Sequence, residues 1–302
     1  MEGMSDSEYE MDISDNESRY SPTSLLRNVS RMRVDDLASP LVTSPVSEEE
    51  IHEIEHFYRG LDIIDIVWFK LLKKTVNNVC LFPIYMHTEV EIDFDDNFID
   101  AFVDFKDYYS RGVISKEQVK DKLESCGKDT ITVMFVELQY LNYLHSNVLV
   151  VDNKRKVVEH YEPHGEYTFW ETAYDQDFQI VLELQLSNTF KDIGYKYTRV
   201  HNVCHQTNFT NNQLIEEIGY CNVYSGWFAL YRCQNMNYSL EKFTRLIDSI
   251  QRDRGAEYIA RYAKEIMKHV NEIAKKYGVT WDHLDDLNDY LIEYKLFELE
   301  FV

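Results

Sequence analysis

One cysteine of the chain occupies a position in which a thiol can become a nucleophile. Gly219 and Tyr220 precede Cys221 at a point where the sequence predicts that a loop leads into a helix. At a helix N-terminus, free backbone N–H groups and the helix dipole favour a thiolate, and a neighbouring protonated histidine favours it further. This pattern is typical of a thiol nucleophile, and a buried structural cysteine is the alternative.

A histidine and a carboxylate are expected to face each other on a β-hairpin upstream. Two runs rich in β-branched residues flank the predicted turn Asp152-Asn153-Lys154-Arg155. If the turn is centred between its two middle residues, His145 and Glu162 lie directly opposite on one face, with Cβ atoms ~5 Å apart. Glu162 would then hold the imidazole in one tautomer, as the third member of a catalytic triad does. A surface ion pair across the two strands is the alternative.

An acyl-transfer site also requires hydrogen-bond donors for the oxyanion that forms during the reaction. Gln206 lies upstream of Cys221 and can supply a side-chain N–H, to which backbone N–H groups at Cys221 can add. Gln213 competes with Gln206 for this role. Either glutamine can equally be an ordinary polar loop residue.

Most other kinds of site lack their signatures. The chain has neither a Walker loop nor a G-x-G-x-x-G, G-x-S-x-G or paired C-x-x-C motif. One alternative is an irregular zinc cluster whose spacing matches no common zinc pattern. Its members would be His201, Cys204, His205 and Cys221. We therefore expect no bound metal and no cofactor.

The formal net charge of −22 limits the partners of this chain. Phosphate contacts need clustered Lys and Arg, so direct nucleic-acid binding is not expected, and anionic membrane surfaces would repel the chain. Cationic partners or basic substrate segments fit better. No apolar run approaches the ~20 residues of a membrane span, and the first residues lack the features of a secretory signal. We expect an intracellular protein that is not secreted.

The five cysteines are odd in number and scattered along the chain. This pattern predicts reduced thiols in a cytosol-like compartment rather than a disulfide framework. Apart from Cys221 and the zinc alternative, the expectation is that Cys80, Cys126 and Cys233 are buried structural cysteines.

The composition changes near residue 46. The first part contains three Ser-Pro pairs, and residues 2–17 hold seven acids and no base, which predicts a disordered acidic tail over 1–46. A regulatory, phosphorylated tail and a tail with no specific role both remain open. We expect residues 47–302 to form a single catalytic-type domain. Its parts are a helical N-terminal part (47–129), a core with the site (130–238) and C-terminal helices (239–302).

Apolar spacing within that domain predicts an α+β fold with a central, mostly antiparallel or mixed sheet flanked by helices. Capping boxes at Ser47 and Ser115 mark two helix starts. The expected helices are 51–61, 97–109, one that follows Ser115, 174–190, 221–233 and most of 239–296. The expected strands are 79–85, 131–141, 145–151, 156–161 and 195–203.

Four short pieces in a fixed order carry a resemblance to a known family. They are the His145–Asp152 stretch, the Val157–Gly165 stretch with its Glu-Pro-His-Gly ending, His205-Gln206, and Gly219-Tyr220-Cys221 with Trp227 behind it. The chain thereby resembles proteins of large DNA viruses, and the order His, acid, Gln, Cys is similar to the adenoviral endopeptidase and SUMO-protease superfamily. The resemblance covers roughly residues 130–235.

The resemblance implies an adenain-like fold with His145 as general base, Glu162 as its orienter, Gln206 as oxyanion donor and Cys221 as nucleophile. The substrate would be a virion precursor or a ubiquitin-like conjugate, in the host cytoplasm or the virion. Compared with SUMO proteases, the chain lacks the Asp-Cys-Gly segment, has Asn222 after the cysteine and has Ser146 in place of a tryptophan beside the histidine. A catalytically inactive member of the same fold, acting as a viral structural or host-interaction protein, is the alternative.

Overall fold

A computed structural model describes residues 62–93, 98–108, 110–140, 143–163, 165, 175–201 and 221–278, to which every structural statement below refers. Within them, five helices surround one eight-stranded sheet. The helices are α4 (Asp62–Thr75), α5 (Lys116–Ser125), α6 (Asp175–Asp192), α7 (Cys221–Gln234) and α8 (Leu240–Tyr277). The strands are β1 (Val79–Cys80), β2 (Ile84–Asp93), β3 (Phe98–Asp107), β4 (Val113–Ile114), β5 (Ile131–Tyr140), β6 (Tyr143–Asp152), β7 (Val157–Tyr161) and β8 (Lys196–Arg199).

The sheet is mixed. Its strand order is β4-β3-β2-β5-β6-β7-β8, and β1 pairs with one end of β5. The pairs β2–β5, β7–β8 and β1–β5 are parallel, whereas the other neighbours are antiparallel. The predicted α+β class, with a central mixed sheet flanked by helices, is confirmed.

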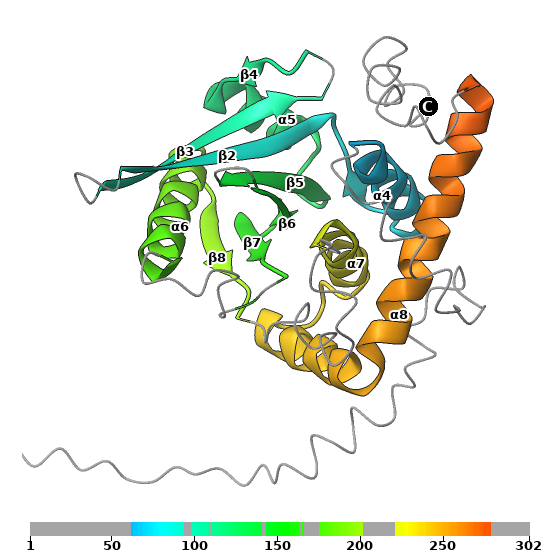
Figure 1. The fold of residues 1–302 in the computed structure, drawn as a ribbon. Coiled ribbons are helices and arrows are strands. Elements are labelled where there is room, and N and C mark those ends of the chain that lie inside the picture. Colours follow the sequence, from blue (N-terminus) through cyan, green and yellow to red (C-terminus); the bar gives the residue numbers. More distant parts are fainter. Residues whose placement is uncertain are drawn as a thin grey trace, which may run out of the picture. The chain divides into compact units, whose positions relative to one another are not determined.

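Helices cover both faces of the central strands. On one face α6 packs on β3 and β8, and on the other α7 packs on β6 with α4 and α8 beyond it (Figure 1). The middle of β6 is therefore buried on both sides. Leu149 and Val151 join the apolar cluster that includes Leu186 of α6, and Val148, which points to the opposite face, is equally buried. Strands buried on both faces appear in a sequence as continuous apolar runs, as this one does.

The hairpin of β6 and β7 has a different register from the predicted one. Asp152 pairs with Val157, so the turn spans residues 153–156 and its centre lies one residue later than assumed. The Asp152 carboxylate accepts the backbone N–H of Arg155 at 2.9 Å, and Lys156 closes the turn at a φ of 54°. Each pairing partner therefore shifts by two residues. A shift of two keeps every side chain on its predicted face.

The predicted helix over 97–109 is wrong, because this segment forms strand β3. Ten residue pairs join β3 to β2 in an antiparallel ladder. The exposed fractions alternate along the strand: Ala101 and Phe105 are buried against α6, whereas Phe102 and Asp104 are exposed. Because apolar residues occur on both faces of the strand, the alternation of period two is not evident in the sequence. Pairing with β2 overrides any local preference for a helix.

Other expected elements are present with adjusted ends. Ser115 caps α5, and the reciprocal hydrogen bonds between Ser115 and Gln118 confirm the second capping box. Helices α6 and α7 match their predicted segments, the last predicted strand shortens to β8, and α8 runs without a break. The acidic tail, the capping box at Ser47 and the helix over 51–61 lie outside the described residues.

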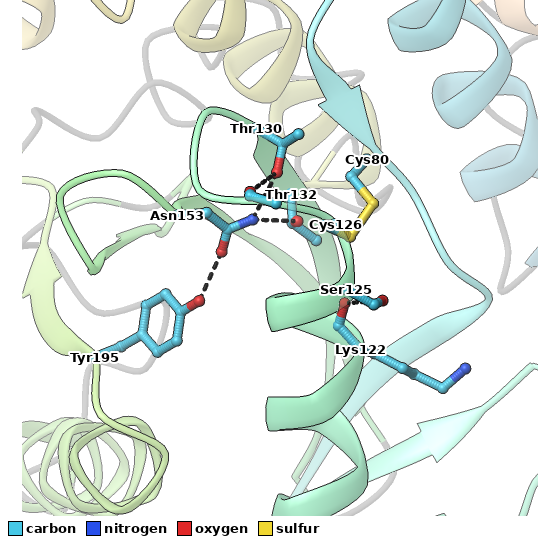
Figure 2. Close-up of a disulfide and its surroundings, with 9 residues drawn as sticks. Cys80, Lys122, Ser125, Cys126, Thr130, Thr132, Asn153 and Tyr195 are labelled. Carbon is cyan, nitrogen blue, oxygen red and sulfur yellow. Dashed lines mark hydrogen bonds between the residues drawn. A yellow bond between two sulfur atoms is a disulfide. The ribbon is translucent and has the colours of Figure 1, made fainter.

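The prediction of reduced thiols is wrong for two of the cysteines. Cys80 and Cys126 form a disulfide with a Cα–Cα distance of 5.8 Å (Figure 2). Cys80 ends β1, which pairs with β5, and Cys126 is the C-cap of α5. The two residues are 46 positions apart in the sequence, so only the strand pairing reveals that they meet.

This disulfide should contribute to the stability of the fold. Closing a loop of 46 residues stabilises a protein by roughly 4 kcal/mol in the chain-entropy model. We expect Cys126→Ser to lower the free energy of unfolding by about that amount in urea titrations under oxidising conditions. With a reductant, variant and wild type should agree. As a control, Cys221→Ser should, like wild type, be more stable under oxidising conditions than with a reductant. If the free energy of unfolding of wild type is the same in both conditions, the prediction is contradicted.

Candidate active site

One residue of β6 holds the first turn of α7 against the sheet. Cys221 is the first residue of α7, and its sulfur accepts a hydrogen bond from the backbone N–H of Ser146 at 3.4 Å. One helical turn later, the Ser225 hydroxyl donates to the carbonyl oxygen of Ser146 at 2.9 Å. Because α7 engages both backbone groups of Ser146, the position of the sulfur along β6 is fixed.

His145 joins Cys221 to Glu162. Its Nε2 atom lies 2.7 Å from Oε1 of Glu162, and its side chain also hydrogen-bonds to Cys221. The histidine and glutamate side chains are only 15% and 13% exposed, which is too buried for a surface ion pair. The contact expected from the hairpin is present, although the observed register places the two residues diagonally rather than directly opposite.

The His145 ring keeps its proton to higher pH than a free imidazole. Burial lowers its pKa, but the charges of Glu162 and Cys221 and the hydrogen bonds to both outweigh burial, so the pKa lies well above 6.5. Because Nε2 faces Glu162, Nδ1 is the nitrogen that can exchange a proton with the sulfur. An imidazolium beside a thiolate is the arrangement that activates a cysteine nucleophile.

A second histidine of the hairpin behaves in the opposite way. His160 contacts the Asn147 amide through Nε2 at 3.1 Å and the Tyr197 hydroxyl through Nδ1 at 2.7 Å. Burial lowers its pKa to about 3, opposed by Glu162 and assisted by the positive charges of Arg199 and His145. His160 is therefore neutral at physiological pH and serves as a hydrogen-bonding bridge between β6 and β8.

A buried ion pair fixes the other end of α7. Arg232 donates from Nε and Nη2 to the two carboxylate oxygens of Glu159 on β7, at 2.5 and 2.8 Å. The two side chains are 0% and 2% exposed. The remaining nitrogen, Nη1, donates to the carbonyl oxygens of Asn235 and Tyr238. A fork-to-fork pair of this kind allows one register between helix and strand.

Several predicted site residues lie outside the described residues. These are both candidate oxyanion donors, Gln206 and Gln213, and two members of the alternative zinc cluster, Cys204 and His205. Among the residues that the structure describes, no group of three or more His, Cys, Asp or Glu side chains could hold a metal ion. The oxyanion role of Gln206 stays a prediction.

Two residues that contact the first turn of α7 were not predicted as site residues. Ser146 was noted only as a departure from the SUMO proteases, and Ser225 was not noted at all. One signal was available for Ser225, since it follows Cys221 by one helical turn and so shares its helix face.

The comparisons with known proteins give distant relatives. No family model matches the chain. A curated protein of Acanthamoeba polyphaga mimivirus, named putative ankyrin repeat protein L371, is 24% identical over 169 residues. That match spans 49% of this chain but only 21% of the length of the viral protein. The large-DNA-virus branch of the resemblance stays a prediction.

Several solved structures, a SUMO protease among them, are similar at low identity. The SUMO protease Ulp1 with its catalytic cysteine oxidised to a sulfinic acid is 13% identical, with a TM-score of 0.31 and coverage of 82% of this chain and 97% of that one. The Ulp1 protease domain in complex with SMT3, the yeast SUMO orthologue, is 14% identical, with a TM-score of 0.33 and coverage of 81% and 95%. ChlaDub1 from Chlamydia trachomatis is 11% identical, with a TM-score of 0.28 and coverage of 76% and 94%. At these TM-scores the case for an activity rests on the geometry of the site.

Among the described residues, no helix combines the length and the apolar character that a membrane span requires.

Replacing Glu162 should lower the pKa of His145. In Glu162→Gln the carboxylate charge is lost while the burial that lowers the pKa remains, so the titration midpoint of the His145 ring should fall in NMR spectra recorded against pH. A histidine whose folded pKa is raised stabilises the fold below its unfolded pKa of ~6.5, and this contribution is lost as the pH rises through the folded value. The variant should lose that pH dependence. Glu137→Gln, whose carboxylate pairs with His87, is the matched control and should leave the His145 midpoint unchanged.

Removing the buried cation should strongly destabilise the fold. Arg232→Met leaves the buried Glu159 carboxylate with only the more distant Arg155 guanidinium, at 3.5 Å, and should cost about 3–5 kcal/mol in urea denaturation. Arg232→Met combined with Glu159→Leu should recover most of that loss, because no charge stays buried. Arg245→Met, which breaks an exposed pair with Glu241 on α8, is the control and should cost under about 1 kcal/mol. Equal losses from the Arg232 and Arg245 variants would contradict the assignment.

Proposed function

We propose that the protein is a thiol-protease-type hydrolase that cleaves peptide or isopeptide bonds. The observation that carries the proposal is the buried chain of contacts from Cys221 through His145 to Glu162. It supplies a sulfur at a helix N-terminus, an imidazole in contact with it and a carboxylate that holds the imidazole. These are the parts that nucleophilic catalysis by cysteine needs.

The reaction begins with the thiolate of Cys221. The sulfur attacks the scissile carbonyl carbon and forms a tetrahedral intermediate with a negatively charged oxygen. The backbone N–H of Cys221, at the start of α7, is the proposed backbone donor to that oxygen. Gln206 is the proposed side-chain donor. One such donor contributes about 3 kcal/mol to lowering the barrier.

His145 then moves the protons. The imidazolium donates its proton to the leaving amine as the C–N bond breaks, which leaves a thioester on Cys221. A water molecule next attacks the thioester and gives its proton to His145, and the carbon–sulfur bond breaks to release the carboxylic acid product. Glu162 keeps Nε2 occupied, so that Nδ1 faces the sulfur throughout the cycle.

The proposed substrates are proteins with basic segments, virion precursors or ubiquitin-like conjugates. A net charge of −22 attracts cationic chains, which supports the first class. The order of the histidine, acid, glutamine and cysteine pieces supports the other two, through the family that the sequence resembles.

Labelling of the thiols tests the proposal. A vinyl-sulfone or iodoacetamide probe should react with Cys221 at least tenfold faster than with Cys233, as mapped by mass spectrometry. Both thiols are buried, but Cys221 has the His145 imidazolium beside it, whereas burial raises the pKa of Cys233. Cys221→Ala should abolish cleavage of a library of basic peptides and ubiquitin-like precursors, while Cys233→Ala, the matched control, should retain it. Equal labelling of the thiols, or cleavage that survives in Cys221→Ala, would favour the inactive binding protein.

A further inference from the structure

A chain of hydrogen bonds connects α4 to the residue that follows the candidate nucleophile. Asn222 accepts a hydrogen bond from Nε1 of Trp68 at 3.2 Å and donates from its amide nitrogen to Asp65 at 2.6 Å. The second carboxylate oxygen of Asp65 accepts the Tyr108 hydroxyl at 2.5 Å. Both ends of the Asn222 amide are therefore held by α4. A side chain fixed in this way cannot turn without breaking two hydrogen bonds.

A glycine brings the two helices close enough for these contacts. Gly226 lies one turn after Asn222, and a Cβ atom placed on it would lie 2.0 Å from the Trp68 ring. No larger residue fits there unless the indole moves. Trp68 is fully buried and stacks on Tyr262 of α8 at a centroid distance of 5.9 Å. Packing against Gly226 and Tyr262 thus helps to direct the indole N–H at Asn222.

The carboxyl group in this chain is retained against a cost in stability. Asp65 is buried, and burial raises its pKa to about 7, although the hydrogen bonds from Tyr108 and Asn222 oppose the rise. The charge of Glu137 on β5 raises the pKa further. An apolar side chain would avoid this desolvation. An apolar side chain at position 65 would, however, leave the Asn222 amide without its hydrogen-bond acceptor.

A helix start needs such support. The first residues of a helix have N–H groups without acceptors in the helix, so this turn frays most readily. Cys221 is the first residue of α7 and Asn222 the second, so any unwinding of the turn displaces the sulfur. The two hydrogen bonds to Asn222 hold this turn from the side of α4, while Ser146 holds it from the side of β6.

We propose that Asp65 is a positioning residue for Cys221, acting through Asn222 to keep the first turn of α7 wound and the sulfur between the Ser146 N–H and the His145 ring. The inference rests on the proposed function of Cys221 as a nucleophile. Asp65 acts on the reaction by setting the position of the residue that follows the cysteine.

An exchange of the two side chains tests this role. Asn222→Asp places two carboxylates face to face, and Asp65→Leu removes the acceptor, so each should slow alkylation of Cys221 by iodoacetamide at least tenfold. In the double variant Asp65→Asn with Asn222→Asp, the new amide at position 65 can donate to the new carboxylate at position 222, which still accepts from Trp68. The alkylation rate of this double variant should return to within about threefold of wild type. Asn222→Asp alone should recover below neutral pH, where one carboxyl group of the pair is protonated and can donate to the other.

Controls separate positioning from general stability. Tyr231→Phe removes a buried hydrogen bond between α7 and α8, at 3.2 Å, far along α7 from Cys221, and should leave the alkylation rate unchanged. If the double variant stays as slow as Asn222→Asp, or if Asp65→Leu reacts like wild type, the positioning role is overturned. If wild-type Cys221 is no more reactive than Cys233, the proposed function fails instead.

Discussion

The buried ion pair between Arg232 and Glu159 is the constraint on which the site geometry depends. It ties the last turn of α7 to β7, while Ser146 ties the first turn of the same helix to β6. Both strands belong to one hairpin. The helix that carries Cys221 and the hairpin that carries His145 and Glu162 therefore form one rigid unit, and the three side chains are placed relative to each other by contacts at both ends of a single helix.

Apolar packing alone would leave the helix freer to slide. Phe228 stacks on Tyr161 with ring centroids 4.1 Å apart, which fixes the spacing between helix and sheet, but stacked rings tolerate small translations. A bidentate guanidinium–carboxylate pair does not tolerate such translations, because both of its hydrogen bonds lengthen together when the helix moves. The cost of burying two charges is offset here by the four hydrogen bonds of Arg232 and by the Phe243 ring, which lies 5.1 Å from its guanidinium carbon. We infer that register rather than stability accounts for this pair.

The features that could be predicted from the sequence are those encoded by neighbouring residues. The hairpin around residues 153–156, the cap at Ser115 and the start of α7 at Cys221 each follow from a short pattern. The features that escaped depend on segments far apart in the chain. Strand β3 needs β2 as its partner, and the Cys80–Cys126 disulfide needs β1 to pair with β5. The predicted centre of the hairpin turn was one residue too early. The position at which the turn begins is set by a side-chain hydrogen bond of Asp152 rather than by the composition of the turn.

The register of the hairpin also affects how protons are distributed in the site. His145 and His160 are both buried on the same hairpin, so desolvation alone would lower the pKa of each. Glu162 distinguishes them, because it lies diagonally from His145 and bonds to its Nε2, whereas both ring nitrogens of His160 face neutral partners. A shift of one residue would have turned Glu162 to the other face of the sheet, away from the His145 ring. The turn at Asp152 thus helps to place a carboxylate against the imidazole that contacts Cys221.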